Sequence, residues 1–373
     1  MLVARLLSKI YKKDGIVLVD YQGQKYICGK PDLQKPLTLK LLNKNLNWKL
    51  VLNPDLNFPE AYMRGEIKFE NVTFSYDSNV ILDSVSFKLK KGDSIAIVGT
   101  SGGGKTTIAK LILKSIQADS GKITFEDQEI DNQKKNLEKI RMNCQMIHQD
   151  PYDSINPRMR IGDIISEPLE IHNIGNKEER KKRVIEVLQE VKLEPAEEII
   201  QKYPHMLSGG QRQRIVLARA LSLQPKIILA DEPVSMLDVS IRAEMLELMK
   251  ELQKKYNISF IYITHDLATA KYFGQRIAIL YLGKIVETGP INQVLENPKH
   301  PYTQALIDAI SEPDPENLHK EKKIRIKESV KTEHFEGCRF KARCPYAIKK
   351  CSIEPNLEEV EQGHYSACYV KLD

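Results

Sequence analysis

The pattern of apolar and polar positions divides the chain into three regions. Residues 1–65 carry short alternating segments, such as DGIVLVDYQGQKYICG, that predict a small module rich in strands. Residues 66–311 alternate apolar runs, among them SIAIVG, KIILAD and SFIYITHD, with stretches of helical periodicity. This alternation predicts an α/β domain built on a largely parallel sheet. Residues 312–373 begin with a charged stretch and end in a segment rich in cysteine.

The amino-acid composition limits the class of protein to which the chain can belong. Of 373 residues, 42% are hydrophobic and 28% charged, which is ordinary for a soluble globular protein. The net charge of +6 permits an anionic partner such as a nucleotide but is too weak to indicate nucleic acid. No apolar run reaches the roughly 18–20 residues of a membrane helix. Because Arg5 and Lys9 interrupt the first apolar stretch, we expect no secretory signal and a cytoplasmic protein.

The stretch GTSGGGKT, residues Gly99–Thr106, follows the apolar run SIAIV and precedes a helical stretch. It has the spacing G-x-x-x-x-G-K-S/T, whose glycines let successive backbone N–H groups turn toward phosphate oxygens. The Lys105 ammonium can reach the outer phosphates of a nucleotide, and the Thr106 hydroxyl is a candidate Mg²⁺ ligand. The predicted nucleotide-binding residues here are Gly99, Ser101, Gly102, Gly103, Gly104, Lys105, Thr106 and Thr107.

Two acidic residues follow the second apolar run, in the stretch KIILADEP. Residues Ile227–Ala230 predict a buried strand that ends at Asp231. We expect Asp231 to hold Mg²⁺ through water, and Glu232 to act as general base on the attacking water. Paired acids at the end of a strand are common, but after a phosphate loop they favour a nucleotide hydrolase.

The stretch LSGGQRQR lies between these two motifs. Because of this stretch, the chain resembles the ATP-binding cassette (ABC) ATPases. The LSGGQ motif distinguishes that family from other proteins with a phosphate loop. Ser208 also predicts the N-cap of a helix, whose free N–H groups can bind phosphate. The resemblance implies that Ser208, Gly209, Gly210 and Gln211 receive the γ-phosphate of an ATP bound to a second subunit. It also implies a P-loop nucleotide-binding fold with a helical subdomain.

Four further residues match elements of the same family. Tyr76, in FSYDS, stands where the family stacks an aromatic ring on adenine. Gln149, in IHQDP, matches the glutamine that contacts Mg²⁺ and the helix of the membrane partner. Asp238, in SMLD, matches the loop that crosses the dimer interface. His265, in YITHD, matches the histidine that contacts the γ-phosphate. The resemblance thus implies an ATPase with Gln149, Glu232 and His265 as its catalytic residues and with ATP and Mg²⁺ as ligands.

Three other stretches narrow the resemblance. HQDPYDSINPRM, DEPVSMLDVSIRAEML and NPKHPYTQALIDAI are similar to the oligopeptide and dipeptide importers, a group that includes nickel and antimicrobial-peptide uptake systems. The resemblance implies a paired ABC ATPase in a heterodimer or homodimer, two transmembrane permeases and an extracytoplasmic substrate-binding protein. It also implies a position at the cytoplasmic face of the cell membrane. The cargo stays open between peptide, nickel and cationic peptide.

Two other functions are alternatives at this stage. A soluble ABC ATPase of translation or DNA repair usually carries two cassettes or a long coiled coil, and this sequence has one cassette and no sustained heptads. Residues 35–67 resemble the N-terminal segment of cyclopropane-fatty-acid synthase, which suggests lipid modification. That family needs a glycine-rich loop for S-adenosylmethionine, which this sequence lacks. A genuine fusion and a mispredicted reading frame both explain the segment.

The cysteines gather near the C-terminus, at Cys338, Cys344, Cys351 and Cys368. In a reducing compartment such a cluster favours a metal over disulfides. Zinc ribbons favour C-x2-C pairs, which are absent, whereas the wider spacing suits a 4Fe–4S cluster, as similar tails in the importer group also imply. Zinc and reduced structural thiols remain the alternatives. We expect the two other cysteines, Cys28 and Cys144, to pack as small hydrophobic residues.

Overall fold

The computed structural model describes residues 65–309, Ile326 and 336–372, together with three short strands before residue 65. The chain forms two compact units, Met1–Arg64 and Gly65–Asp373. In the first, β1 (Ile16–Val19) pairs antiparallel with β2 (Lys25–Cys28) and parallel with β3 (Thr38–Lys40). The resemblance predicted for residues 35–67 lies almost entirely outside the described residues, as does the side chain of Cys28.

The second unit is built on an eight-stranded sheet with the order β14-β15-β13-β12-β6-β11-β10-β9. Five neighbouring strands, from β12 to β9, run parallel, which confirms the predicted α/β class. The strands are β6 (Ser94–Val98), β9 (Cys144–Ile147), β10 (Ile227–Asp231), β11 (Ser259–Thr264), β12 (Arg276–Tyr281), β13 (Lys284–Pro290), β14 (Glu358–Glu361) and β15 (His364–Ser366).

A second, antiparallel sheet has the order β5-β4-β7-β8. Its strands are β4 (Gly65–Tyr76), β5 (Asn79–Lys90), β7 (Ser120–Phe125) and β8 (Gln128–Glu129). The helices of this unit are α4 (Lys105–Ile112), α5 (Lys134–Asn143), α6 (Pro151–Ser154), α7 (Ile161–Ile171), α8 (Lys177–Glu190), α9 (Ala196–Ile199), α10 (Gly209–Ser222), α11 (Val239–Tyr256), α12 (Leu267–Phe273), α13 (Ile291–Glu296) and α14 (Pro301–Asp308).

The central strands are mostly apolar because both faces of the sheet are covered. Successive side chains of a strand point to opposite faces. In β6, Ile95 and Ile97 therefore join a core shared with α4 and the antiparallel sheet, while Ala96 and Val98 join a second core shared with α10 and α11. All five residues of this strand are buried. Uninterrupted apolar runs are typical of such doubly covered parallel strands.

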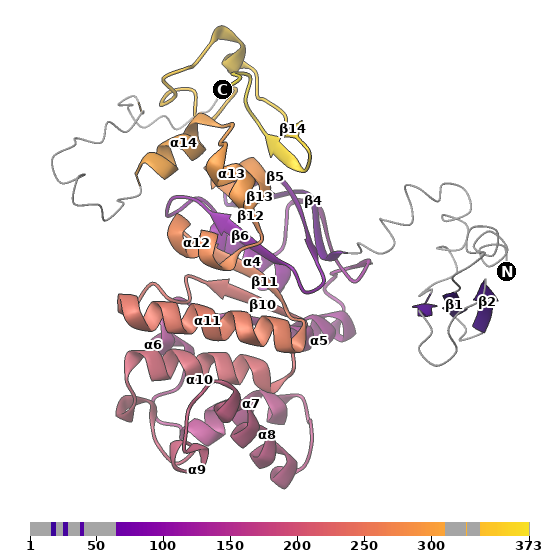
Figure 1. Cartoon of the computed structure of the whole chain (residues 1–373), viewed down its shortest axis with the longest axis vertical. Coiled ribbons are helices and arrows are strands. Elements are labelled where there is room, and N and C mark those ends of the chain that lie inside the picture. Colours follow the sequence, from indigo (N-terminus) through magenta and orange to yellow (C-terminus); the bar gives the residue numbers. More distant parts are fainter. Residues whose placement is uncertain are drawn as a thin grey trace. The chain divides into compact units, whose positions relative to one another are not determined.

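Helices α7, α8, α9 and α10 form a separate helical group within this unit. Helix α10 packs against α7 and α8, and Figure 1 shows α7–α10 together at one end of the unit, with β14 at the other. At that other end, β15 pairs antiparallel with β13, so the C-terminal strands extend the central sheet. The boundaries predicted at residues 65 and 311 stay predictions. Nowhere in the described part of the chain is a helix long and apolar enough to cross a bilayer.

Candidate functional site

The stretch Gly99–Gly104 links the end of β6 to the start of α4, so the first N–H groups of α4 face this loop. Gly104 has a φ of 93°, and a Cβ there would lie 2.7 Å from Leu82 Cδ2. A Cβ on Gly99 would lie 2.2 Å from the carbonyl oxygen of Leu280. A Cβ on Gly102 would meet nothing within 4 Å. The loop is therefore tightly packed on its inner side and open where a phosphate would approach.

Lys105 is 6% exposed and bonded to the loop that it follows. Its ammonium donates to the carbonyl oxygens of Gly99, at 2.8 Å, and Thr100, at 3.0 Å. Burial lowers the pKa of Lys105, and the nearby carboxylates of Glu232 and Asp231 oppose that change. The cation thus sits between the loop and the two acids, where it can exchange carbonyl oxygens for phosphate oxygens.

The two residues predicted to hold Mg²⁺ at the end of β10 and the start of α4 lie next to each other. Asp231 is 7% exposed. Burial raises its pKa, and the neighbouring carboxylate of Glu232 adds to the increase. A hydrogen bond with Thr106 and the charge of Lys105 oppose that increase. A carboxylate beside a hydroxyl is a pair of oxygen ligands of the kind that Mg²⁺ prefers, so these residues fit that ion.

The three predicted catalytic residues come together at Glu232. One carboxylate oxygen of Glu232 lies 3.0 Å from Nδ1 of His265, and the other accepts a 3.3 Å hydrogen bond from Nε2 of Gln149. Glu232 has a φ of 48°, in the left-handed region, and its N–H donates to the carbonyl oxygen of Ile263 on β11. A non-glycine residue in that conformation is strained, and such strain is concentrated at functional sites.

The other residues predicted to contact nucleotide lie around this centre or on exposed surfaces. Tyr76, at the end of β4, is 45% exposed, with its ring perpendicular to that of Phe74 and so accessible for stacking. Ser101 is exposed, and Thr107 is buried in α4. Asp238 is the N-cap residue of α11, but its side chain makes no capping hydrogen bond and is exposed.

The LSGGQ stretch begins α10. Ser208 and Gln211 form a capping box: the Ser208 N–H donates to the Gln211 side chain, and the Gln211 N–H donates to the Ser208 hydroxyl. A Cβ on Gly210 would lie 2.6 Å from Ile241 Cγ2, so this glycine lets α10 approach α11 closely. A Cβ on Gly209 would meet nothing within 4 Å. Gly209 is thus exposed at the start of the helix, with free space around it.

The C-terminal segment from residue 336 to residue 372, here called the cysteine lobe, brings its four cysteines to one cavity of about 10 Å³. Burial raises the pKa of Cys338, and raises that of Cys368 to about 11. None of the described cysteines forms a disulfide. Cys144 is buried in the core. Within the described ranges, however, no group of three or more His, Cys, Asp or Glu is arranged to hold a metal ion, so the predicted zinc and iron–sulfur sites lack support.

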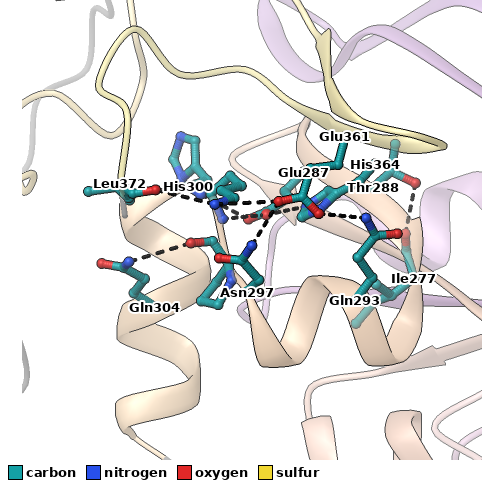
Figure 2. Close-up of polar contacts among 12 residues, drawn as sticks. Ile277, Glu287, Thr288, Gln293, Asn297, His300, Gln304, Glu361, His364 and Leu372 are labelled. Carbon is teal, nitrogen blue, oxygen red and sulfur yellow. Dashed lines mark hydrogen bonds and ion pairs between the residues drawn. The ribbon is translucent and has the colours of Figure 1, made fainter.

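A buried polar network that no sequence motif predicts joins β13, α14 and the cysteine lobe (Figure 2). Glu287, on β13, is fully buried, and its carboxylate accepts hydrogen bonds from the backbone N–H groups of Lys299, at 2.6 Å, and His300, at 3.0 Å. It also lies 2.7 Å from Nε2 of His364 on β15. Nδ1 of His300 accepts from the N–H of Tyr302 and caps α14, and burial lowers the pKa of His300 to about 3.

These contacts describe the HPYT stretch in structural terms: the backbone N–H of His300 bonds to the buried carboxylate of Glu287, and its side chain caps α14. No sequence pattern marks Glu287, because its strand also contains Lys284 and Thr288 and its partner His364 is distant in the chain.

Comparison with known proteins agrees with this geometry. Residues 82–235 match the ABC transporter family, and residues 286–351 match the C-terminal region of the oligopeptide/dipeptide transporter family. Two solved structures share the fold. The cbiO1 protein of Clostridium perfringens, part of the ABC transporter complex cbiONQ, is 26% identical, covers 63% of this chain and 92% of its own, and has a TM-score of 0.58. The ATP-binding cassette MJ0796, a post-hydrolysis dimer with ADP and Pi, is 29% identical, with corresponding coverages of 60% and 98% and a TM-score of 0.54.

The fold and the arrangement of the site define an ABC ATPase, for which ATP and Mg²⁺ are the expected ligands. Two relatives indicate the group within the ABC ATPases to which the chain belongs. The oligopeptide transport ATP-binding protein AppF of Bacillus subtilis is 40% identical over 294 residues, which are 78% of this chain and 89% of the relative. The di/tripeptide transport ATP-binding protein DppF of Pseudomonas aeruginosa is 42% identical over 294 residues, with coverages of 77% and 89%. The chain belongs to the ABC transporter ATPases of the oligopeptide/dipeptide importer type.

Proposed function

We propose that the chain is the ATP-hydrolysing subunit of an importer that carries peptides across the cytoplasmic membrane. The observation that carries this proposal is the meeting of Gln149 and His265 at Glu232, beside the phosphate loop. The match of residues 286–351 and the names of AppF and DppF favour peptides over nickel. They also favour transport over a role in translation, DNA repair or lipid modification.

Each residue of the centre has a role in hydrolysis. The backbone of Gly99–Gly104 and the Lys105 ammonium hold the outer phosphates, and the ring of Tyr76 stacks on the adenine. Thr106, Asp231 and Gln149 would hold Mg²⁺, which would supply positive charge against the phosphates. Glu232 accepts a proton from the attacking water, because its carboxylate is held at the loop by two neighbours. His265, oriented by Glu232, contacts the γ-phosphate.

The open end of α10 serves a second subunit. Ser208, Gly209, Gly210 and Gln211 receive the γ-phosphate of an ATP bound to the partner, and Asp238 contributes from the loop that crosses the interface. The exposure of Ser208, Gly209 and Asp238 supports this arrangement. The partner is a related ATPase, in a heterodimer or homodimer.

The assembled importer contains this pair of ATPases, two transmembrane permeases and an extracytoplasmic substrate-binding protein, with the chain at the cytoplasmic face of the membrane. We further propose the division into an accessory module (1–65), the cassette (66–311) and a C-terminal extension (312–373). The accessory module has no assigned chemistry, because the resemblance to cyclopropane-fatty-acid synthase falls on residues whose side chains are outside the described part of the chain.

Reconstitution tests the function. The chain is co-expressed with candidate permeases and a candidate partner ATPase from the same organism, and the complex is placed in vesicles with a candidate substrate-binding protein. We expect the complex to form and to take up labelled di- to pentapeptides at the expense of ATP. Uptake of nickel without peptide uptake, or failure of the chain to co-purify with any permease, would contradict the proposal. ATP hydrolysis by the purified chain separates loss of catalysis from a wrong cargo.

For the cysteine lobe we propose a 4Fe–4S cluster in preference to a single zinc ion. The support is that the four thiols line one cavity and that the wide spacing of the cysteines suits such a cluster. Such a cluster would tie together a segment too small for a large core of its own. Iron and sulfide analysis of anaerobically purified chain tests this, with Cys344→Ser expected to lose iron and Cys144→Ser to retain it. Absence of iron and sulfide from the wild-type chain would overturn the assignment.

A further inference from the structure

Two arginines on one face of α10 contact the short helix that follows Gln149. Arg212 and Arg219 are separated by about two helical turns, so their side chains leave α10 on the same side. The Cζ atom of Arg212 lies 4.3 Å from the centre of the Tyr152 ring, and Nη1 of Arg219 donates to the carbonyl oxygen of Ser154, at 3.3 Å. Figure 1 shows α6 beside α10. The segment after Gln149 is therefore attached to α10 at two points.

Arg212 also contacts the segment that leads into the LSGGQ stretch. Its Nε donates to the carbonyl oxygen of Pro204, at 2.7 Å, and Pro204 begins the short 3-10 helix that ends two residues before Ser208. The residue is only 9% exposed, and hydrogen bonds from a charged donor are stronger than neutral ones. One guanidinium thus joins the ring of Tyr152, on α6, to the backbone just before α10.

The turn between Gln149 and Tyr152 is held by its own hydrogen bonds. Asp150 caps α6: its carboxylate accepts from the N–H of Tyr152, at 2.7 Å, and its carbonyl oxygen accepts from the hydroxyl of Ser154, at 2.7 Å. Pro151 is the first residue of α6, and its ring fixes its own φ. A change in the position of Gln149 should therefore reach Tyr152 instead of being absorbed between them.

We propose that Arg212 and Tyr152 are positioning residues that couple the site of Gln149 to the LSGGQ stretch. Gln149 donates to Glu232, at 3.3 Å, and it leaves that carboxylate when it turns toward a bound nucleotide. Tyr152 moves with Gln149, and Arg212 passes the movement to Pro204. The start of α10 is thereby oriented for the partner's ATP only in a chain that itself holds a nucleotide. The inference rests on the proposed function, and it is independent of the cargo.

The first test asks whether nucleotide binding reaches the start of α10. Hydrogen exchange is measured on the full chain with and without a non-hydrolysable ATP analogue and Mg²⁺, at a concentration at which light scattering shows a monomer. Peptides that cover residues 146–152 and 203–211 report on the two segments that Arg212 joins. We expect both to exchange more slowly with the analogue, because ordering a segment raises the free energy of opening it. In Tyr152→Leu, we expect only residues 146–152 to respond.

Two further variants show whether the aromatic face is what matters. Tyr152 is 64% exposed, so these substitutions leave the core intact. Tyr152→Phe keeps a ring for the Arg212 cation, and its residues 203–211 should respond as in the wild type. The matched control is Tyr272→Leu, which removes another exposed ring, 3.8 Å from Nζ of Lys250, and should also respond as the wild type does.

Several results of this test would overturn the coupling. They are an unchanged exchange of residues 203–211 in the wild type, a wild-type response in Tyr152→Leu, and loss of the response in Tyr152→Phe or Tyr272→Leu. A wild-type chain that binds no analogue would instead refute the ATPase assignment on which the proposal rests.

The second test asks whether Tyr152 acts through Arg212. Arg212→Lys keeps the charge but removes the planar group over the ring and the Nε donor to Pro204. Arg212→Lys, Tyr152→Leu and the double variant complete a cycle with the wild type, in which kcat and KM for ATP hydrolysis are measured. We expect Tyr152→Leu to lower kcat by roughly 2- to 5-fold at an unchanged KM, the effect of one exposed cation–π contact.

The double variant should lose no more than Arg212→Lys alone, because the ring has no function without the guanidinium. Additive losses in the double variant, or a change in KM without a change in kcat, would contradict the coupling. If Arg212→Lys does not fold, the Tyr152 variants and Tyr272→Leu decide alone.

Discussion

Nδ1 of His265 lies 3.0 Å from Oε1 of Glu232, although the two residues follow different strands, β11 and β10. These strands are parallel neighbours, so their carboxyl ends lie at the same edge of the sheet. The same holds for Gln149, which follows β9, the next strand. The carboxylate of Glu232 is therefore held on both sides, in the orientation that proton abstraction from a water at the γ-phosphate requires.

Replacement of Glu232 by Gln keeps the size of the side chain but removes its capacity to accept a proton. We expect Glu232→Gln to lower kcat for ATP hydrolysis by about 10²- to 10⁴-fold while ATP still binds. Phosphate release and nucleotide binding are measured on the same preparation. As a control, Glu251→Gln removes a carboxylate that pairs with Lys192 away from the centre, and its turnover should equal that of the wild type. Turnover near the wild-type level in Glu232→Gln would refute the role of general base.

The two glycines of the LSGGQ stretch should respond differently to alanine. Gly210→Ala places a methyl group against Ile241 and should lower the melting temperature. Gly209→Ala has free space within the chain, so we expect an unchanged melting temperature and unchanged binding of ATP to the monomer. If the partner's ATP meets this face, Gly209→Ala should still lose ATP-dependent dimerisation and hydrolysis. Dimerisation is followed by light scattering with Glu232→Gln in the background. Full dimerisation of the Gly209→Ala chain would place the partner elsewhere.

The parts of the site that the sequence predicts are those whose residues lie close together in the chain, because their spacing determines how they are arranged in space. The phosphate loop, the acids after KIILA and the LSGGQ cap each depend on a strand–loop or loop–helix unit a few residues long, so the local pattern contains them. The convergence of Gln149 and His265 on Glu232 follows from their places after parallel strands. The contact of Glu287 with His364 joins residues 77 positions apart, and that of Arg339 with Asp83 joins residues 256 positions apart. Such pairs depend on the packing of the whole unit.

The cysteine lobe illustrates the same limit. The spacing of its four cysteines favoured an iron–sulfur cluster over zinc and structural thiols but could not give the distances between the thiols, because the paired strands β14 and β15 lie between Cys351 and Cys368. The structure shows that the four line one cavity but form no group suited to a metal ion in the described residues. What sequence reasoning could not supply was the attachment of this lobe to the cassette, through Arg339, Phe340 and the buried Glu287.

The buried pair of Glu287 and His364 should be the main polar attachment of the C-terminal strands. Glu287→Gln removes the charge and one of the oxygens that accept from Lys299, His300 and His364, and it leaves buried donors without a partner. We expect the free energy of unfolding to fall by about 3 kcal/mol, measured by urea denaturation. Glu361→Gln, which changes a more exposed carboxylate bonded to Gln293 and Asn297, should have a much smaller effect. Equal effects of the two substitutions would contradict this attachment.

Burial of His300 should make the stability of the chain depend on pH. Its pKa is lowered from 6.5 to about 3, so between these values the unfolded chain binds a proton that the folded chain excludes. Stability should therefore be complete above pH 6.5 and fall as the pH decreases, by about 2 kcal/mol from this group between about pH 7.5 and pH 5.

His300→Asn isolates this contribution, because an asparagine side chain can still cap α14 but does not titrate. We expect the difference in unfolding free energy between the wild type and His300→Asn to shift by about 2 kcal/mol in favour of the variant over the same pH range. Other carboxylates and histidines affect both proteins equally and cancel in the difference. Parallel pH profiles of the two proteins would show that His300 titrates normally and is accessible to protons in the folded chain.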